Sequence, residues 1–210
     1  MARAIELDSC SKRFGERLAL RRFSLAVAAG ESVALTGPNG SGKSTILRLV
    51  AGLTRPTAGH VTIDGVSSSD LDPGVRQSIA FVGHRPMLYR GLTAAENLRV
   101  VTSLRRLPDS AVAEALATVG LADRADDRVD GFSRGMMQRL ALARLVAGPA
   151  DILLLDEPST GLDAEGKALL AGILGRRRGS ATMLISTHDD AEAAGLADRV
   201  VPIRAPGHAA

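Results

Sequence analysis

Cysteine is almost absent from this chain of 210 residues, which contains a single one, Cys10. One cysteine cannot form an internal disulfide, so we expect the protein to work in a reducing cytoplasm. A lone cysteine most often behaves as a small apolar residue, and Cys10 is therefore expected to pack in the core. The length of the chain is sufficient to bury such a core.

Long apolar runs are also missing. The longest, such as the run that ends in ILLLD at residues 152–156, fall short of the roughly 18 to 20 residues that span a bilayer. The N-terminal stretch MARAIELDSCSKRF alternates apolar and polar residues and has no apolar segment of signal-peptide length. We therefore expect a cytoplasmic chain that does not cross a membrane by itself.

The basic residues form no long stripe. Lys and Arg number 26 against 23 Asp and Glu, and their scattered positions lead us to expect no nucleic-acid partner. The run Arg176–Arg178 precedes Gly179. Two interpretations of this run remain open, a solvated helix end and a contact with lipid headgroups.

Segments with strand and helix periodicity alternate along the chain. The expected strands are residues 5–7, 23–27, 31–37, a short segment within 54–65, 79–83, 151–158 and 181–187, and the expected helices are residues 44–53, 97–104, 111–120 and 164–174. The first two strands are predicted to be antiparallel, and the later apolar strands parallel. Thr93 and Glu96 form the sequence pattern of a capping box, and Asp109 is expected to open the next helix.

This order of segments predicts an α/β fold of one domain, residues 1–210. An N-terminal antiparallel β region would join a core made of residues 1–87 and 146–210, and an α-helical subdomain at about 88–145 would be inserted into that core. The sequence has no repeat and no linker rich in Pro, Gly or Ser that would separate independent units.

A glycine-rich segment, GPNGSGKS, lies between an expected strand and an expected helix. It fits the P-loop pattern G-x-x-x-x-G-K-[ST] in the context that the motif requires. Backbone N–H groups of such a loop surround phosphates, Lys43 can reach the β and γ phosphates, and Ser44 can bind Mg²⁺. The nucleotide-binding residues would be Gly37, Pro38, Asn39, Gly40, Ser41, Gly42, Lys43, Ser44 and Thr45. The alternative is a glycine-rich turn with a chance lysine.

A carboxylate is expected at the end of another buried strand, because P-loop enzymes use one to hold hydrated Mg²⁺. The segment DILLLDEP provides it. Asp156 would bind the metal, and Glu157 could polarise an attacking water. In the alternative interpretation Glu157 is a solvated residue at a strand end.

The segment FSRGMMQRLALARL, residues 132–145, places Ser133 and Gly135 at the start of a helix. Free N–H groups and the helix dipole favour a phosphate at that position. Since the P-loop already serves the chain's own nucleotide, we expect these two residues to face the nucleotide of another subunit.

Together these motifs resemble the nucleotide-binding subunit of an ATP-binding cassette (ABC) transporter over nearly the whole chain. Residues 132–136 match the family's signature motif, usually LSGGQ, with Phe for Leu, Arg134 for the first Gly and Met for Gln. Ser133 and Gly135, the family's phosphate-contacting pair, are retained. The resemblance implies a P-loop NTPase core, ATP and Mg²⁺ as ligands, and ATP hydrolysis as the activity.

Further positions follow from the resemblance. It places Phe14 on the adenine ring and makes Asp163, at the end of STGLD, part of a loop that couples two active sites. His188, in STHDD, matches the switch histidine that contacts the γ-phosphate. The catalytic residues would be Lys43, Glu157 and His188. The alternatives are that Phe14 is a core aromatic residue, that the loop ending in Asp163 is a plain helix-entry turn, and that His188 is structural.

His84, in FVGHRPMLY, takes a position where the family normally has glutamine. That glutamine senses Mg²⁺ and the attacking water, and it begins the loop that touches the membrane subunit. Imidazole can still accept or donate one hydrogen bond, but its reach differs. The resemblance therefore implies nucleotide sensing or coupling, with a structural substitute as the alternative. The implied metal-binding residues are Ser44, Asp156 and His84.

The stretch GHRP...LTAAENL, with FSRGM, resembles one branch of the family, the ATP-binding subunit of the haem exporter of cytochrome c maturation. The resemblance implies that the chain pairs head-to-tail with a second ABC ATPase subunit, as a homodimer. It also implies that this dimer binds integral membrane permease subunits at the cytoplasmic face of the membrane. Three alternatives stay open: the ATPase of another small-molecule or drug exporter, a soluble ABC ATPase without a transport role, and a non-catalytic scaffold.

Overall fold

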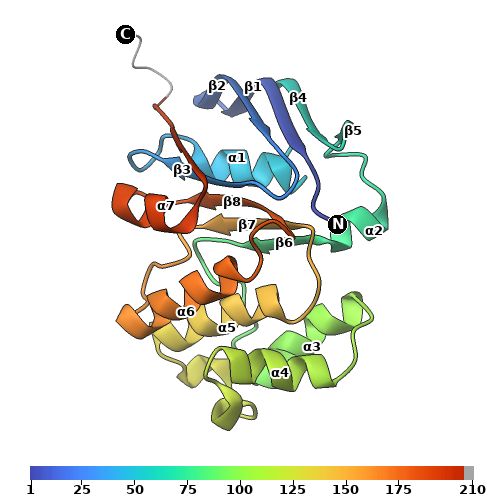
Figure 1. Ribbon diagram of the computed structural model, residues 1–210, viewed down its shortest axis with the longest axis vertical. Helices are drawn as coiled ribbons and strands as arrows, with labels where there is room; N and C mark the ends of the chain where they lie inside the picture. The colour runs from blue at the N-terminus through green and yellow to red at the C-terminus, as the bar shows by residue number, and fades with distance from the viewer. Residues whose placement is uncertain (206–210) are drawn as a thin grey trace.

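Two β-sheets with helices around them form the described part of the protein, residues 1–205, in this computed structural model (Figure 1). The N-terminal sheet is antiparallel, with strand order β2-β1-β4-β5. Its strands are β1 Ile5–Phe14, β2 Arg17–Val27, β4 Ala58–Ile63 and β5 Val66–Ser67. The strands expected at 5–7 and 23–27 pair with each other at the end of a hairpin that is far from its turn. Both strands are longer than expected and continue as far as the turn after Phe14.

The second sheet is parallel, with strand order β6-β7-β8-β3-β9. Its strands are β3 Ser32–Thr36, β6 Ile79–Val82, β7 Ile152–Asp156, β8 Thr182–Ser186 and β9 Arg199–Pro202. Every residue of β3, β7 and β8 is buried, as in central strands covered on both faces. Because the strands are parallel, their carboxyl ends meet at one edge, and Asp156 pairs with Ser186 there.

Helices cover both faces of the parallel sheet (Figure 1). They are α1 Lys43–Val50, α2 Pro73–Gln77, α3 Ala94–Leu104, α4 Ser110–Thr118, α5 Arg134–Val146, α6 Ala164–Gly175 and α7 Asp190–Leu196. Successive residues of β7 point to opposite sides. Leu154 packs in the core that contains α1 and the antiparallel sheet, whereas Leu153 and Leu155 pack in the core that contains α5 and α6. The predicted α/β architecture is confirmed.

The stretch at about 88–145 contains α3, α4, α5 and two 3₁₀ turns, Ala122–Arg124 and Val129–Gly131. The capping box is present, since the Thr93 hydroxyl accepts from the Glu96 N–H and the Glu96 carboxylate accepts from the Thr93 N–H. Asp109 precedes α4, but its side chain makes no capping bond. These helices lie on the side of the parallel sheet away from the antiparallel sheet (Figure 1), which supports the proposed division into a core and an inserted subdomain.

Several smaller expectations have clear outcomes. Cys10 is buried, its thiol donates to the His60 carbonyl at 2.9 Å, and burial raises the pKa of the thiol. Arg177 is half-buried and donates to the carbonyls of Gly148 and Ala150. A solvated helix end is therefore the wrong description of Arg177, because its guanidinium bonds to the loop before β7. The sequence patterns did not indicate α2, α7 or β9.

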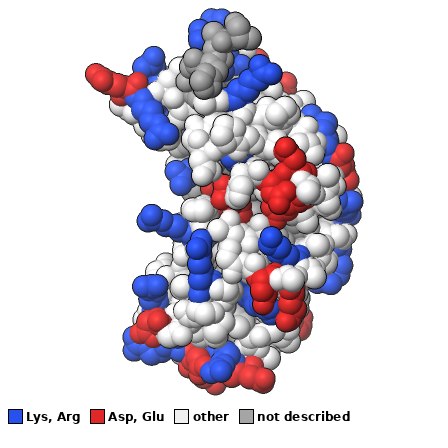
Figure 2. All heavy atoms as spheres, turned by 90° about the vertical axis from the view of Figure 1, so that its left-hand side faces the viewer, with Lys and Arg blue, Asp and Glu red and all other residues white. Residues whose placement is uncertain are grey.

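Within residues 1–205, no helix combines the length and the apolar character that a membrane span requires. Figure 2 looks onto the side of the molecule that carries the loop between β3 and α1, and it shows basic and acidic side chains mixed on this face. In Figure 2 the outline of the molecule is indented on its left edge at mid-height.

Candidate functional site

The loop between β3 and α1 has a backbone that only glycine permits at two positions. Gly37 and Gly42 adopt φ of 136° and 107°, in the region where L-residues are strained. A Cβ on Gly42 would lie 2.7 Å from the Ala19 carbonyl oxygen, so that β2 also excludes a side chain there. The loop consequently turns tightly into α1, whose first residue is Lys43.

Lys43 is 5% exposed, and its ammonium donates to the carbonyls of Gly37 and Pro38 at 2.6 and 3.1 Å. Among residues 1–205 it has no carboxylate partner. The hydroxyl of Ser41 is buried without any hydrogen-bond partner in the same range. A buried cation and an unsatisfied buried hydroxyl in one loop are costly unless an anion completes the site. These groups fit a phosphate ligand.

An open cleft of about 440 Å³ lies over this loop and is called the nucleotide cleft below. Its lining residues are Phe14, Arg17, Ala19, Asn39, Gly40, Ser41, Gly42, Lys43, Ser44, Thr45, Arg48 and Glu157. Phe14, at the end of β1, is 46% exposed, and the Lys12 ammonium lies 4.9 Å from its ring centre. The exposed ring fits stacking better than the alternative of a core aromatic residue.

The end of β7 presents a buried carboxylate to the loop. Asp156 is 2% exposed, and its Oδ1 atom accepts from Ser44 Oγ at 2.9 Å and from Ser186 Oγ at 2.6 Å. The same oxygen therefore connects the first turn of α1 to the end of β8. A hydroxyl and a carboxylate at this distance are oxygen ligands of the kind that Mg²⁺ prefers.

Glu157 follows immediately and has φ of 49°. A non-glycine residue in this region is strained and often belongs to a functional site. Its N–H donates to the oxygens of Ser186, and its two carboxylate oxygens face two imidazoles. His84 Nδ1 lies 3.4 Å from Oε2, and His188 Nδ1 lies 3.7 Å from Oε1. The loops after β6, β7 and β8 thus place three residues of the expected site in contact.

The residues that could hold Mg²⁺ fit the ion only in part. Ser44 and Asp156 offer two oxygens, whereas His84 is paired with Glu157. In the described range 1–205, no group of three His, Cys, Asp or Glu side chains forms a metal site. Mg²⁺ commonly binds through one or two protein oxygens together with substrate phosphates. The side chains present therefore suit an ion that a nucleotide helps to hold.

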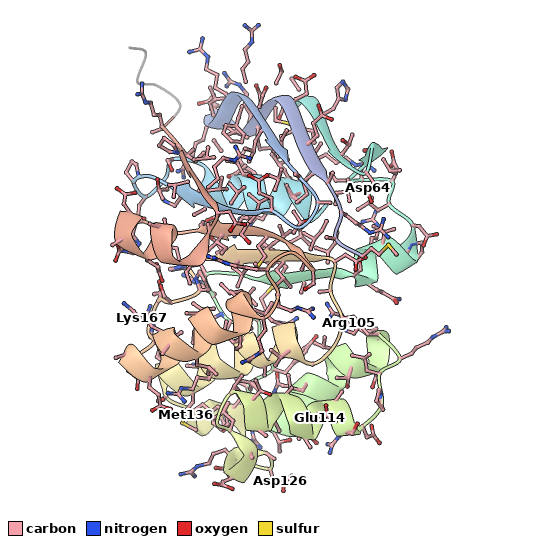
Figure 3. The ribbon with its side chains drawn as sticks, viewed as in Figure 1. Asp64, Arg105, Glu114, Asp126, Met136 and Lys167 are labelled. Carbon is pink, nitrogen blue, oxygen red and sulfur yellow. The ribbon has the colours of Figure 1, made fainter. Side chains whose placement is uncertain are left out.

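Three expected site residues lie apart from the nucleotide cleft, in a second cleft of about 290 Å³. Ser133 caps α5 by accepting from the Met136 N–H at 3.2 Å, and Gly135 lies beside it. Asp163 caps α6, and the N–H of Gly166 together with Arg139 lowers the pKa of its carboxyl. Figure 3 marks this region by Met136, on the helical side of the molecule. The two clefts share no residue.

The comparison with known families agrees with this arrangement. Residues 20–160 match the model of the ABC transporter family. The chain belongs to the ABC transporter family. The dimeric ATP-binding cassette MJ0796, bound to ADP and Pi in a post-hydrolysis state, is similar in structure. Its TM-score is 0.87 at 30% identity, with 95% of this chain and 94% of that chain covered.

Curated ABC relatives include proteins of different transport roles. The ABC transporter ATP-binding protein NatA of Bacillus subtilis is 37% identical over 95% of this chain and 85% of its own length. The Fe(3+) ions import ATP-binding protein FbpC 1 of Rhodococcus jostii is 36% identical, and the Nod factor export ATP-binding protein I of Rhizobium meliloti 37%, each over 98% of this chain. The chain spans only 61% and 62% of the length of these last two.

Sequence reasoning missed several residues of this ABC site. Ser186 bonds to both Asp156 and Glu157, and Arg17 and Arg48 line the nucleotide cleft. The serine could have been found from its place at the end of a buried strand, next to the strand that ends in Asp156. The two arginines carry no motif, and their approach to the cleft depends on the hairpin register and on the rotation of α1.

Proposed function

We propose that this chain is the ATP-hydrolysing motor subunit of an ABC transporter. One observation supports it above the others: the strained Glu157 lies between two imidazoles, beside the Asp156–Ser44 pair and at the edge of the nucleotide cleft. A carboxylate so placed can accept a proton from water at the position where a phosphate on the loop would be attacked. A scaffold that only binds nucleotide would not need this group.

Each residue then has a role in the proposed reaction. Lys43 and the loop N–H groups bind the β and γ phosphates. Ser44 and Asp156 would hold Mg²⁺, which would neutralise charge on the phosphate oxygens. Glu157 acts as general base, His84 and His188 orient its carboxylate, and His188 also contacts the γ-phosphate. Phe14 stacks on the adenine.

The second cleft supports a head-to-tail dimer in this proposal. Ser133, Gly135 and Asp163 line the second cleft at the start of α5, which Ser133 caps and whose first turn contains no acidic residue. Such a helix terminus favours an anion, but it is separate from the chain's own nucleotide cleft. The ATP of a second subunit would supply the anion, so each ATP would lie between two subunits. ATP then joins the pair, and release of phosphate separates it.

Glu157→Gln tests the catalytic proposal. The variant keeps size and hydrogen bonding but loses the base, so we expect the ATPase rate to fall about a hundredfold or more, with ATP binding retained. Size-exclusion chromatography with ATP should show an accumulated dimer. Glu114→Gln, on the exposed face of α4, is the matched control. A Glu157→Gln protein that hydrolyses ATP at the wild-type rate would falsify the role of this carboxylate.

An apolar groove next to the His84 loop supports a membrane partner. It is called the docking groove, encloses about 390 Å³ and is lined by Met87, Leu88, Tyr89, Asn97, Val100, Val101, Leu104 and Arg144. Met87, Tyr89 and Leu104 are each at least 60% exposed. Exposed apolar residues of this size mark interaction sites. We propose that permease subunits bind here, which places the chain peripherally at the cytoplasmic face of the membrane.

The haem exporter of cytochrome c maturation is the transporter that we propose for this subunit. The support is the sequence stretch around His84 together with the FSRGM signature. An exporter of another small molecule is the second candidate, favoured by the 37% identity to a Nod factor export protein. Cells in which Lys43→Ala replaces the native protein should lose covalent haem from c-type cytochromes, measured by haem staining, and should regain it with the native gene. Unchanged staining would refute the haem assignment and leave the ATPase proposal intact.

A further inference from the structure

We propose that Arg17 is a phosphate-binding residue that makes the nucleotide cleft selective for di- and triphosphates. The inference rests on the proposed function, because it assumes that ATP occupies the cleft. Arg17 belongs to none of the sequence motifs, yet it lines the cleft together with the loop residues 39–45.

The hairpin between β1 and β2 brings Arg17 to the cleft. Phe14 and Arg17 are cross-strand partners at its last position, on either side of the turn Gly15–Glu16. The Phe14 ring and the Arg17 guanidinium therefore extend from neighbouring positions on the two strands that flank the turn. Arg17 Nη2 lies 3.7 Å from where a Cβ on Gly40 would be, so the guanidinium is over the phosphate loop itself.

The charge of Arg17 has no partner within residues 1–205. Its side chain is exposed and makes no hydrogen bond or ion pair there, whereas Lys12 donates to the Arg55 carbonyl and Arg13 to that of Glu16. Within residues 1–205, Glu157 is the only acidic residue that lines the cleft, and two imidazoles already contact it. The charge of Arg17 is therefore free to pair with a ligand in the cleft.

The chemistry of a guanidinium determines which ligand this is. Its planar N–H groups match pairs of phosphate oxygens and make strong charge-assisted bonds. The loop N–H groups and Lys43 approach from the floor of the cleft, and Arg17 approaches from the hairpin. A polyphosphate chain would be held from two sides, whereas a nucleoside or a monophosphate would present little charge near Gly40.

Isothermal titration of the full chain with Mg²⁺ and ATP, ADP or AMP tests the inference. We expect Arg17→Ala to weaken ATP and ADP binding by about tenfold to a hundredfold and AMP binding by less than about threefold. Arg17→Lys should recover part of the loss, because it restores the charge without the fork. The control is Arg21→Ala, an exposed arginine of the same strand that does not line the cleft.

Several results would overturn the inference. Unchanged ATP affinity in the Arg17→Ala variant would show that Arg17 does not contact the phosphates. An equal loss for AMP and ATP would assign Arg17 to the nucleoside or to the hairpin structure, and an equal loss in Arg21→Ala would assign the effect to overall charge. A different result would contradict the proposed function itself: the wild-type chain would not bind ATP, or the Lys43→Ala variant would bind ATP as tightly as the wild type.

Discussion

At the scale of single residues, His84 occupies a position where the resemblance to the family leads us to expect glutamine. The structure places its Nδ1 atom against one oxygen of Glu157, opposite His188 on the other oxygen. An imidazole beside each oxygen limits the orientations of the carboxylate, and a catalytic base works best when its orientation is fixed. The contact supports a positioning role for His84 over that of a structural substitute.

His84→Ala should lower kcat by about tenfold to a hundredfold, because Glu157 would lose one of its two orienting partners. The dissociation constant for ATP should change little, since the imidazole does not line the nucleotide cleft. His84→Gln should restore most of kcat. Steady-state ATPase assays with ATP titration separate these quantities, and His60→Ala, on an exposed position of β4, is the control. A His84→Ala variant with the wild-type kcat would contradict the positioning role and support a structural role for His84.

The motifs predicted most of the candidate site by residue number, because each motif places a fixed chemistry after a strand. The spacing of GPNGSGKS sets the loop, and Asp156 and Glu157 follow from one buried apolar run. Sequence could not reveal that Lys43 bonds to its own loop carbonyls, or that Glu157 has a positive φ. Those facts depend on how the loop closes against neighbouring strands.

At the scale of elements, the capping box at the start of α3 ties the helical region together. Its hydrogen bonds satisfy two N–H groups that the helix would otherwise leave unpaired. The hydrogen bond from the Thr93 N–H lowers the pKa of the Glu96 carboxyl. The Glu96 carboxylate therefore contributes to folding stability at pH values above the usual glutamate pKa, and this contribution is lost as pH falls through the lowered pKa.

Thr93→Ala should destabilise the folded chain by about 1 kcal/mol, the usual cost of losing an N-terminal cap. Urea unfolding at neutral pH measures the change in the free energy of unfolding. Thr93→Ser keeps the hydroxyl and should recover most of the stability, and Ser103→Ala, at an exposed position of the same helix, should change it little. Equal destabilisation by Thr93→Ser and Thr93→Ala would show that the methyl group, not the cap, matters.

Element prediction succeeded where burial imposes a strong pattern. The fully buried strands β3, β7 and β8 and the capped helix α3 were all expected. The short elements were not, because α7 has only seven residues and β9 is largely exposed. Such elements form because the buried sheet offers them a place to pack or pair, as Ala193 does against Ala34.

At the scale of the whole molecule, the guanidinium of Arg199 connects β9 to the turn before β3 and to β2 of the other sheet. Arg199 of β9 donates to Glu31 Oε1 at 2.7 Å and to the Ala26 carbonyl of β2. The Glu31 carboxylate also accepts from the Ala28 N–H. The hydrogen bond from Arg199 lowers the pKa of Glu31, and the same pairing raises the pKa of Arg199.

Glu31→Gln should destabilise the chain by up to about 1 kcal/mol at pH 7, the range of an exposed ion pair. Because folding lowers the pKa of Glu31, the contribution is present above the usual glutamate pKa and disappears as pH falls through the lowered value. The difference between wild type and variant should therefore shrink below about pH 4. Urea unfolding at several pH values measures it, with Glu16→Gln as control. A difference that stays constant with pH would contradict the prediction.

The separation of the nucleotide cleft from the second cleft has a genetic consequence. In the proposed pair, each working site takes its P-loop from one copy and its signature residues from the other. A cell that makes intact and Lys43→Ala copies in equal amounts would assemble, by random pairing, only about one quarter of its dimers from two intact copies. A defective allele would then be partly dominant over the normal one, even though the altered lysine lines the nucleotide cleft and not the second cleft.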